Sequence, residues 1–151
     1  MEWFVKAFLK ASLAWLGAGV TLGIAMAIHP AWTVYRTAHF HMNLLGFVAM
    51  MIFGVAYHVL PRFAGHPLRS HQLAKAHWWL ANAGLLLMTS GFVLVARGVA
   101  TAWVVVAAGG LSSAAGAYAF IYNLWRTLDG PPRARRVAQL GAQLVRAPVR
   151  R

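Results

Sequence analysis

The sequence predicts an all-α integral membrane protein, a four-helix bundle in one domain with both termini in the cytoplasm. Of its 151 residues, 60% are hydrophobic, and the mean hydropathy is +0.60. The only acidic residues are Glu2 and Asp129. Such a chain cannot offer water a normal globular surface, and its apolar runs have the roughly 20 residues that a membrane-spanning helix needs.

Four hydrophobic segments define the expected helices, at about residues 7–29, 34–60, 76–96 and 101–125. Pro30 is expected to end the first helix and Pro61 the second, because proline lacks the amide that a helix interior uses. The pair Arg97-Gly98 leaves room only for a tight turn between the third and fourth segments. Those two helices must therefore be antiparallel neighbours.

Basic residues lie at the ends of the apolar segments, which accounts for a formal charge of +12 without any need for a nucleic-acid partner. They gather before the first segment, in the connection 62–75, and after the fourth segment. By the positive-inside rule these parts face the cytoplasm, in the inner (plasma) membrane. His29, His39 and His41 then lie near the outer surface, and His58 and His77 near the inner surface. For His58 and His77 we expect solvation at the interface, the alternative being a second site that the two form together.

Residues 1–130 are expected to form the transmembrane domain, and residues 131–151 a basic cytoplasmic tail. The tail has apolar residues at helical spacing among arginines, so it is either an amphipathic segment on anionic lipid or disordered. The first 28 residues also resemble a secretory signal, with basic residues before an apolar stretch. We interpret them as a span, because the apolar run is longer than a usual signal core.

Small residues are concentrated in the first and fourth segments. The first contains Gly17, Gly19 and Gly23, and the fourth contains Gly109, Gly110, Ser112, Ser113 and Gly116. Small residues let helix backbones approach closely inside a membrane. These faces are expected to be packing seams, either within the bundle or between subunits of a homo-oligomer.

Two histidines lie in the first turns of the second apolar segment, where an imidazole normally has a partner. His39 begins a face of polar, small and soft side chains that follows steps of three and four residues: His39, Asn43, Gly46, Met50, Gly54 and Tyr57. This face should point into the bundle, where its small residues leave space for a flat cofactor. His41 lies about 200° around the helix from His39, so the two cannot point to the same place.

The chain has no cysteine, which excludes disulfides, thiolate metal sites, covalent c-type haem and cysteine-held iron–sulfur clusters. A bound metal must therefore use histidine, methionine or oxygen. Neutral imidazole is a common ligand of transition metals and of haem iron. The competing interpretation is that these histidines only bind water or a carbonyl at the head-group boundary.

The second segment combines Arg36, the step His41-Met42-Asn43, two glycines, Tyr57 and Pro61-Arg62. The third segment begins H-W-W-L-A-N-A-G. In these features the chain resembles helices 2 and 3 of the catalytic subunit of heme-copper oxidases, most closely the C-type oxidases and nitric oxide reductases. It also resembles small four-helix proteins described as oxidase-subunit-I-like. The likeness covers about half of the chain.

The resemblance implies a haem b site in the outer half of the bundle. Its H-x-N step selects His41 as the ligand of the haem iron, with Asn43 beside it, whereas the helical face selects His39. A second axial ligand must lie at a similar depth, and the candidates are His29, Met26, Met88 or a histidine of another subunit.

The chain departs from the family because later helices of a full subunit carry the other haem ligands and the copper or iron ligands. An enzymatic oxygen- or NO-reducing centre is therefore not expected here. The predicted function is a membrane haem b protein with an electron-transfer or accessory role in respiration or denitrification, in contact with lipid and with respiratory-complex subunits. The alternative is a cofactor-free structural subunit or assembly factor. A transporter is disfavoured because the spans lack a buried carboxylate.

Overall fold

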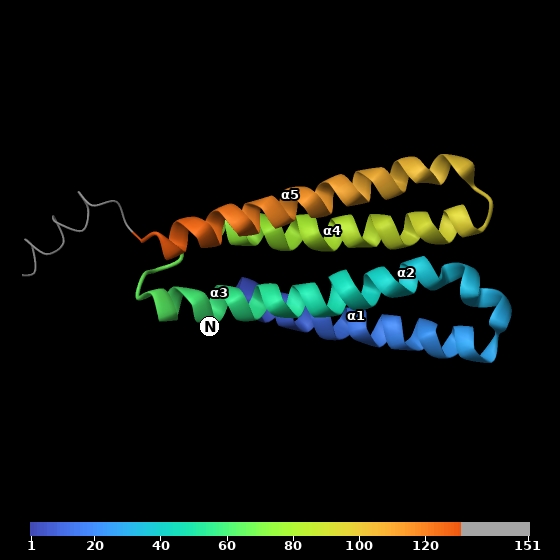
Figure 1. Cartoon of the computed structure of the whole chain (residues 1–151), viewed down its shortest axis with the longest axis horizontal. Helices are drawn as coiled ribbons and strands as arrows, with labels where there is room; N and C mark the ends of the chain where they lie inside the picture. Colours follow the sequence, from blue (N-terminus) through green and yellow to red (C-terminus); the bar gives the residue numbers. More distant parts are fainter. Residues whose placement is uncertain (131–151) are drawn as a thin grey trace, which may run out of the picture.

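The computed structural model describes residues 1–130 and consists of four long helical rods side by side (Figure 1). Each rod is long and apolar enough to cross a membrane, as the sequence predicted. The expected tail, residues 131–151, lies outside the described residues. The elements are α1 (Trp3–Ile28), η1 (Pro30–Tyr35), α2 (Arg36–His41), η2 (Met42–Ala49), α3 (Met50–Ala64), α4 (His71–Ala96), η3 (Ala100–Ala102) and α5 (Trp103–Leu128).

The rods run alternately up and down, so that each packs against the next one in the chain. The second rod is the continuous run from η1 to α3; it lies against α1, while α4 pairs with α5 as predicted. The N-terminus, the α3–α4 connection and the end of α5 lie at one end of the bundle (Figure 1). Both ends of the described chain therefore share one side of the membrane, and the assignment of that side to the cytoplasm stays a prediction.

Helix ends follow the expected signals with one exception. Pro30 follows α1 and begins η1, and Gly98 has a left-handed φ of +85° in the tight turn before α5. The prediction that Pro61 ends the second helix is wrong, because Pro61 lies inside α3. The helix closes one turn later at Gly65, whose φ is +66°, with the bonds His66 N to Pro61 O (3.1 Å) and Gly65 N to Arg62 O (3.2 Å). This is a Schellman motif, which requires the left-handed glycine.

The second rod contains a π-helix that the sequence analysis did not predict. It covers Met42–Ala49, directly after the two histidines of α2. A π-helix widens the turn, and such segments are frequent at functional sites. The expected inward face survives this change, since Gly46, Met50, Gly54 and Tyr57 are all buried.

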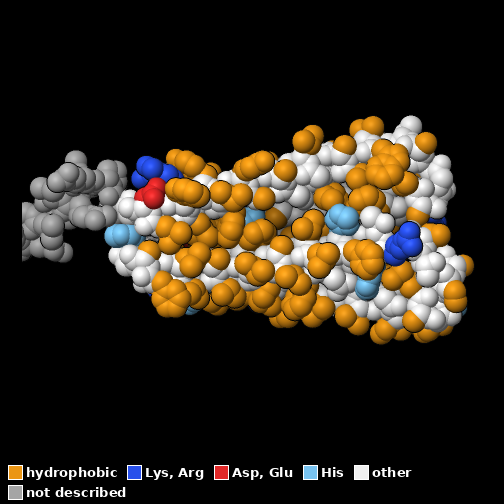
Figure 2. All heavy atoms as spheres, in the orientation of Figure 1, with side chains coloured by type: hydrophobic (Ala, Val, Ile, Leu, Met, Phe, Trp, Pro, Cys, Tyr) orange, Lys and Arg blue, Asp and Glu red, His pale blue; other side chains and the backbone are white. Residues whose placement is uncertain are grey.

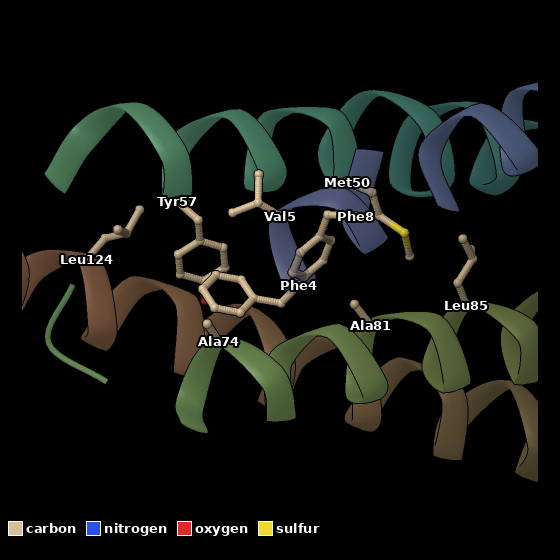
Figure 3. Packing of buried hydrophobic residues seen from close by; sticks show 9 residues of the cluster. All are labelled: Phe4, Val5, Phe8, Met50, Tyr57, Ala74, Ala81, Leu85 and Leu124. Carbon is tan, nitrogen blue, oxygen red and sulfur yellow. The ribbon is translucent and has the colours of Figure 1, made fainter. Parts of the chain in front are cut away.

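The hydrophobic core lies in the half of the bundle that holds the N-terminus. All four rods contribute to it, and Phe4 and Phe8 of α1 are fully buried at its centre (Figure 3). Because lipid is as apolar as the core, these side chains stabilise the bundle through close packing of the helices. The first helix is thus an integral part of the packed bundle. The core residues are Phe4, Val5, Phe8, Met50, Tyr57, Ala74, Ala81, Leu85 and Leu124.

Glycines form the seam between α4 and α5, as expected from the small-residue pattern. A Cβ added at Gly109 would lie 2.6 Å from both Gly84 O and Met88 N. A Cβ at Gly91 would lie 2.9 Å from Val106 N. Both positions need glycine, because the opposing backbone occupies the space of a side chain.

A polar clasp holds the α3–α4 connection against α5. Asn123 is fully buried; its Oδ1 accepts from Ser70 N at 2.9 Å, and its Nδ2 donates to Ser70 O at 2.7 Å. Arg69 N donates to Oγ1 of Thr127 at 2.9 Å. The clasp satisfies backbone groups that would otherwise be left unpaired beside the start of α4.

Hydrophobic side chains cover most of the visible surface, and the charged side chains in this view lie toward its two ends (Figure 2). Large apolar side chains are exposed along the rods; the exposed fraction is 72% for Val104 and 74% for Leu111. Outward apolar residues between charged ends are what a bilayer stabilises. The chain is therefore a multi-pass membrane protein.

Candidate haem-ligating histidines

His39 and His41 lie on opposite faces of α2, as the helix geometry predicted. His39 points toward α1, where its Nδ1 lies 2.9 Å from the carbonyl oxygen of Gly19. A Cβ added at Gly23 would lie 2.9 Å from Cε1 of His39. The pair Gly19 and Gly23 therefore forms a seam inside this chain, and the imidazole of His39 fills it.

His41 points toward α4. Its ring lies against Phe92, with ring centroids 4.8 Å apart, and it is half-buried. Its Nδ1 lies 2.8 Å from the carbonyl oxygen of Thr37, one turn earlier on the same helix. The ring thus stands between the α1–α3 half and the α4–α5 half of the bundle.

Both imidazoles have the hydrogen-bond pattern of a metal-ligating histidine. A carbonyl oxygen can only accept, so these bonds require the proton on Nδ1 of His41 and of His39. Nδ1 of His39 also lies 3.3 Å from Nδ2 of Asn43, which cannot donate to it in this tautomer. Nε2 then holds the free lone pair. A backbone carbonyl on the other ring nitrogen fixes the tautomer and the orientation of the ring in this way at many metal sites.

The face that begins with His39 does not leave the space that we expected for a flat cofactor. Asn43 lies over Gly19, where an added Cβ would be 2.6 Å from its Nδ2, and Asn43 also donates to the carbonyl of His39 at 2.9 Å. Gly46 is covered by Trp15, 2.6 Å from an added Cβ. Side chains of this chain already fill these positions, so the helix face by itself does not favour His39 as the ligand.

Two of the expected second ligands, His29 and Met88, have other neighbours in the structure. His29 is exposed at the end of α1 and contacts Trp32, with ring centroids 5.7 Å apart. Met88 lies on α4 one turn from Phe92, but its Sδ faces α5, 3.8 Å from Oγ of Ser113. Among residues 1–130, no group of three or more His, Asp or Glu side chains could hold a metal ion.

His58 and His77 differ from one another more than the sequence indicated. His58 lies near the surface, where Arg62 Nη1 donates to Nδ1 of His58 at 3.1 Å and also to its carbonyl. The interpretation of His77 as a solvated interfacial residue is wrong, because its side chain is fully buried. The possible shared site of His58 and His77 is not formed either, since His77 pairs with the hydroxyl of Tyr57 at 3.1 Å.

Aromatic rings surround the imidazole of His77. The ring centroids of Phe8, Phe53 and Phe120 lie 4.8, 4.6 and 5.4 Å from that of His77. They come from α1, α3 and α5, three helices that meet only in the folded bundle. The helical spacing predicted that Tyr57 faces the bundle. Its hydrogen bond to His77 could not be predicted, because the two residues lie on different helices.

Four apolar spans and a helix-borne pair of histidines define a multi-pass membrane protein with candidate metal ligands in the second span. Residues 3–130 match the family model of cytochrome c and quinol oxidase polypeptide I. The chain belongs to this family, subunit I of the heme-copper oxidases, as its resemblance implied. The match extends beyond helices 2 and 3 to all four spans.

Three curated relatives support this membership. The cbb3-type cytochrome c oxidase subunit CcoN1 of Stutzerimonas stutzeri is 30% identical over 152 residues, covering 81% of this chain and 32% of the relative. Cytochrome c oxidase subunit 1 of Rhodobacter capsulatus is 30% identical over 132 residues, covering 71% and 24%. A subunit 1 homolog of Agrobacterium tumefaciens is 28% identical over 127 residues. The chain thus spans about a third or less of the relatives' length.

Proposed function

We propose that this chain is a membrane haem b protein with an electron-transfer or accessory role in respiration or denitrification. Membership of subunit I of the heme-copper oxidases supports a haem-related function. The observation that carries the proposal is the bond of His41 Nδ1 to the Thr37 carbonyl, which leaves Nε2 as a metal ligand. Bound haem iron would supply one-electron redox chemistry.

His41 fits an axial ligand better than His39. The ring of His39, half-buried like that of His41, packs on α1 against Gly19 and Gly23, and this packing would have to open before a porphyrin could approach from that side. His41 is half-buried on the face toward α4, with Phe92 as an aromatic neighbour. In this assignment His39 and Asn43 hold α2 against α1 and so position His41.

The second ligand of the haem iron is proposed to come from outside residues 1–130. Met88 and His29 have other neighbours, as described above, and the chain covers only 32% of the CcoN1 relative. A second copy, or another subunit of a respiratory complex, would supply a histidine that holds the haem iron together with His41. The expected location is the inner (plasma) membrane, with the basic ends in the cytoplasm.

A cofactor-free structural subunit or assembly factor is the second candidate function. One observation favours it: the carbonyl of Gly19 and the ring of His39 form a tight helix–helix contact that needs no cofactor. In that case His39 would serve only in helix packing, and the imidazole of His41 would only bond to the Thr37 carbonyl of its own helix.

An optical spectrum separates these two functions. The full chain would be expressed with ample haem supply and purified in detergent, and a dithionite-reduced minus oxidised spectrum recorded. The haem b proposal predicts the bands of a six-coordinate b-type haem. A protein that is folded but colourless would favour the cofactor-free alternative.

A further inference from the structure

A pocket opens at the end of the bundle that holds the N-terminus, where α1 begins, α3 ends and α4 begins. Its volume is about 380 Å³, within the range of about 300–1,000 Å³ that is usual for pockets with small organic ligands. The charged and imidazole side chains that line it are Glu2, Arg62, His66 and His71. Glu2, Arg62 and His71 are exposed and His66 is half-buried, so a ligand can reach all four.

The guanidinium of Arg62 is the permanent positive charge in the lining of this pocket. Its Nη1 donates to Nδ1 of His58, one turn earlier on α3, at 3.1 Å. Among residues 1–130 no carboxylate pairs with Arg62, since the ion pairs found there join other residues. A guanidinium binds phosphate through a planar fork of N–H groups, and the groups other than Nη1 remain for such a ligand.

Imidazoles and helix ends add further donors to the pocket. His66 and His71 line it, and an imidazole has at least one N–H in either protonation state. α1 begins at Trp3 and α4 at His71, and neither helix has an acidic residue in its first turn. Because the N-terminal end of a helix dipole favours negative charge, these helix ends act in the same direction as Arg62. Together these groups favour an anion.

Glu2 is the lining residue that opposes an anion. Its Oε1 lies 3.8 Å from Nε2 of His71. Three exposed basic residues at the same end outweigh this charge: Lys6, Arg69 and Lys75 lie near the starts of α1 and α4 and in the connection before α4. The whole chain has 14 Lys and Arg residues but only two acidic ones, so most of its positive charge needs counter-ions from outside the chain.

Exposed aromatic side chains place the pocket at the boundary between lipid tails and head groups. Phe63 follows Arg62 directly and is 84% exposed, and Trp3 at the start of α1 is exposed as well. Aromatic residues beside basic ones are typical of membrane interfaces. A ligand of this pocket therefore comes most readily from the head-group layer of the bilayer.

The accessible apolar residues of the pocket favour a phospholipid over a bare phosphate. Pro61 and Leu68 are half-buried and Pro67 is exposed, and all three line the pocket. A phosphate ion would leave these carbon surfaces uncovered, whereas the glycerol of a phospholipid covers them.

We propose that this pocket binds the phosphate and glycerol of an anionic glycerophospholipid, of the phosphatidylglycerol type, with the guanidinium of Arg62 on the phosphate. His66 and His71 donate to the remaining phosphate oxygens, and the acyl chains stay in the surrounding bilayer. The site is independent of the proposed haem function, because it lies at the opposite end of the bundle from α2 (Figure 1).

Lipid titration followed by native mass spectrometry tests the proposal. The full chain, freed of lipid in a neutral detergent, would be titrated with phosphatidylglycerol or with phosphatidylcholine of the same acyl chains. We expect the first phosphatidylglycerol to bind about tenfold more tightly, because phosphatidylcholine has no net charge and its choline group lacks hydrogen-bond donors. Equal affinity for the two lipids would overturn the preference for an anionic head group.

Two arginine variants show whether the lipid binds in the pocket. Arg62→Gln should weaken phosphatidylglycerol binding about tenfold, since it removes the guanidinium from the phosphate. The matched variant Arg69→Gln removes the same charge from the same connection but outside the pocket, and it should stay within about twofold of the native chain. Equal losses in both variants would show diffuse attraction to anionic lipid and overturn the assigned site.

Two further ligands are distinguished in the same assay. Excess inorganic phosphate should leave phosphatidylglycerol bound; its displacement would show a site for free phosphate and overturn the lipid as ligand. Phosphatidylethanolamine has an ammonium group that would pair with Glu2. If it binds more tightly than phosphatidylglycerol to the native chain but not to Glu2→Gln, the ligand is a zwitterionic lipid and the proposal is wrong.

Discussion

The Tyr57 hydroxyl lies 3.1 Å from Nδ1 of His77 and joins α3 to α4 inside the core. Because both side chains are buried, we expect Tyr57→Phe and His77→Leu each to lower the free energy of unfolding by about 1–3 kcal/mol. A double-mutant cycle should give a coupling of about 0.5–1.5 kcal/mol. Unfolding in mixed detergent micelles would measure it.

The control for this cycle is the surface pair His58 and Arg62, whose side chains also contact each other. Replacement of either should change stability by less than about 1 kcal/mol, because the pair is largely open to the surroundings. A coupling between Tyr57 and His77 no larger than that of the surface pair would contradict a structural role for the buried bond.

Adjacent glycines of α5 provide a matched test of the α4–α5 seam. Gly109→Ala should destabilise the bundle by about 1–3 kcal/mol, since the new methyl would meet the backbone at Gly84 and Met88. At Gly110 nothing lies within 4 Å of an added Cβ, so Gly110→Ala should be neutral or stabilising. Thermal unfolding in one detergent compares the two; equal effects would show that the seam is misplaced.

The two hydrogen bonds between Asn123 and Ser70 predict that a substitution far from His39 and His41 lowers stability. Asn123→Leu leaves the backbone N–H of Ser70 unpaired, while the Ser70 carbonyl keeps only the longer bond from Ala74 N at 3.4 Å, and we expect a cost of about 1–3 kcal/mol. Tyr122→Leu changes an exposed neighbour and should have little effect. Proteolysis of the α3–α4 connection should become faster only in the Asn123 variant.

Much of this architecture could be predicted because membranes restrict it. Four apolar runs, the turn at Gly98 and the inward face from Gly46 to Tyr57 follow from bilayer thickness and helix periodicity, and all are present. The prediction at Pro61 was wrong because the helix continues through the proline to the left-handed glycine four residues later, which ends it.

The arrangement around the histidines could not be predicted in the same way. His39 contacts Gly19, 20 residues earlier in the chain, and His41 contacts Phe92, 51 residues later. Only tertiary packing defines such contacts. The burial of His77 depends on rings from three other helices. A polar residue near a span end looks the same in sequence whether it faces solvent or a core.

The orientation of the bundle is tested by single cysteines, which the natural chain lacks. Thr33→Cys lies in η1 and Gln72→Cys near the start of α4, and both positions are exposed. The charge distribution predicts that an impermeant maleimide added to intact cells labels Thr33→Cys only. Labelling of Gln72→Cys alone would invert the topology.

The most direct test of the account is the haem spectrum of three single variants beside the native chain. His41→Ala should abolish the b-type bands, because it removes the imidazole whose Nε2 is free on the side of α4. His39→Ala should retain haem, with a shifted haem redox potential or weaker packing of α2 against α1. His58→Ala should leave the spectrum unchanged. Unchanged haem content in the double variant His39→Ala/His41→Ala, or a native protein without haem bands, would contradict the account.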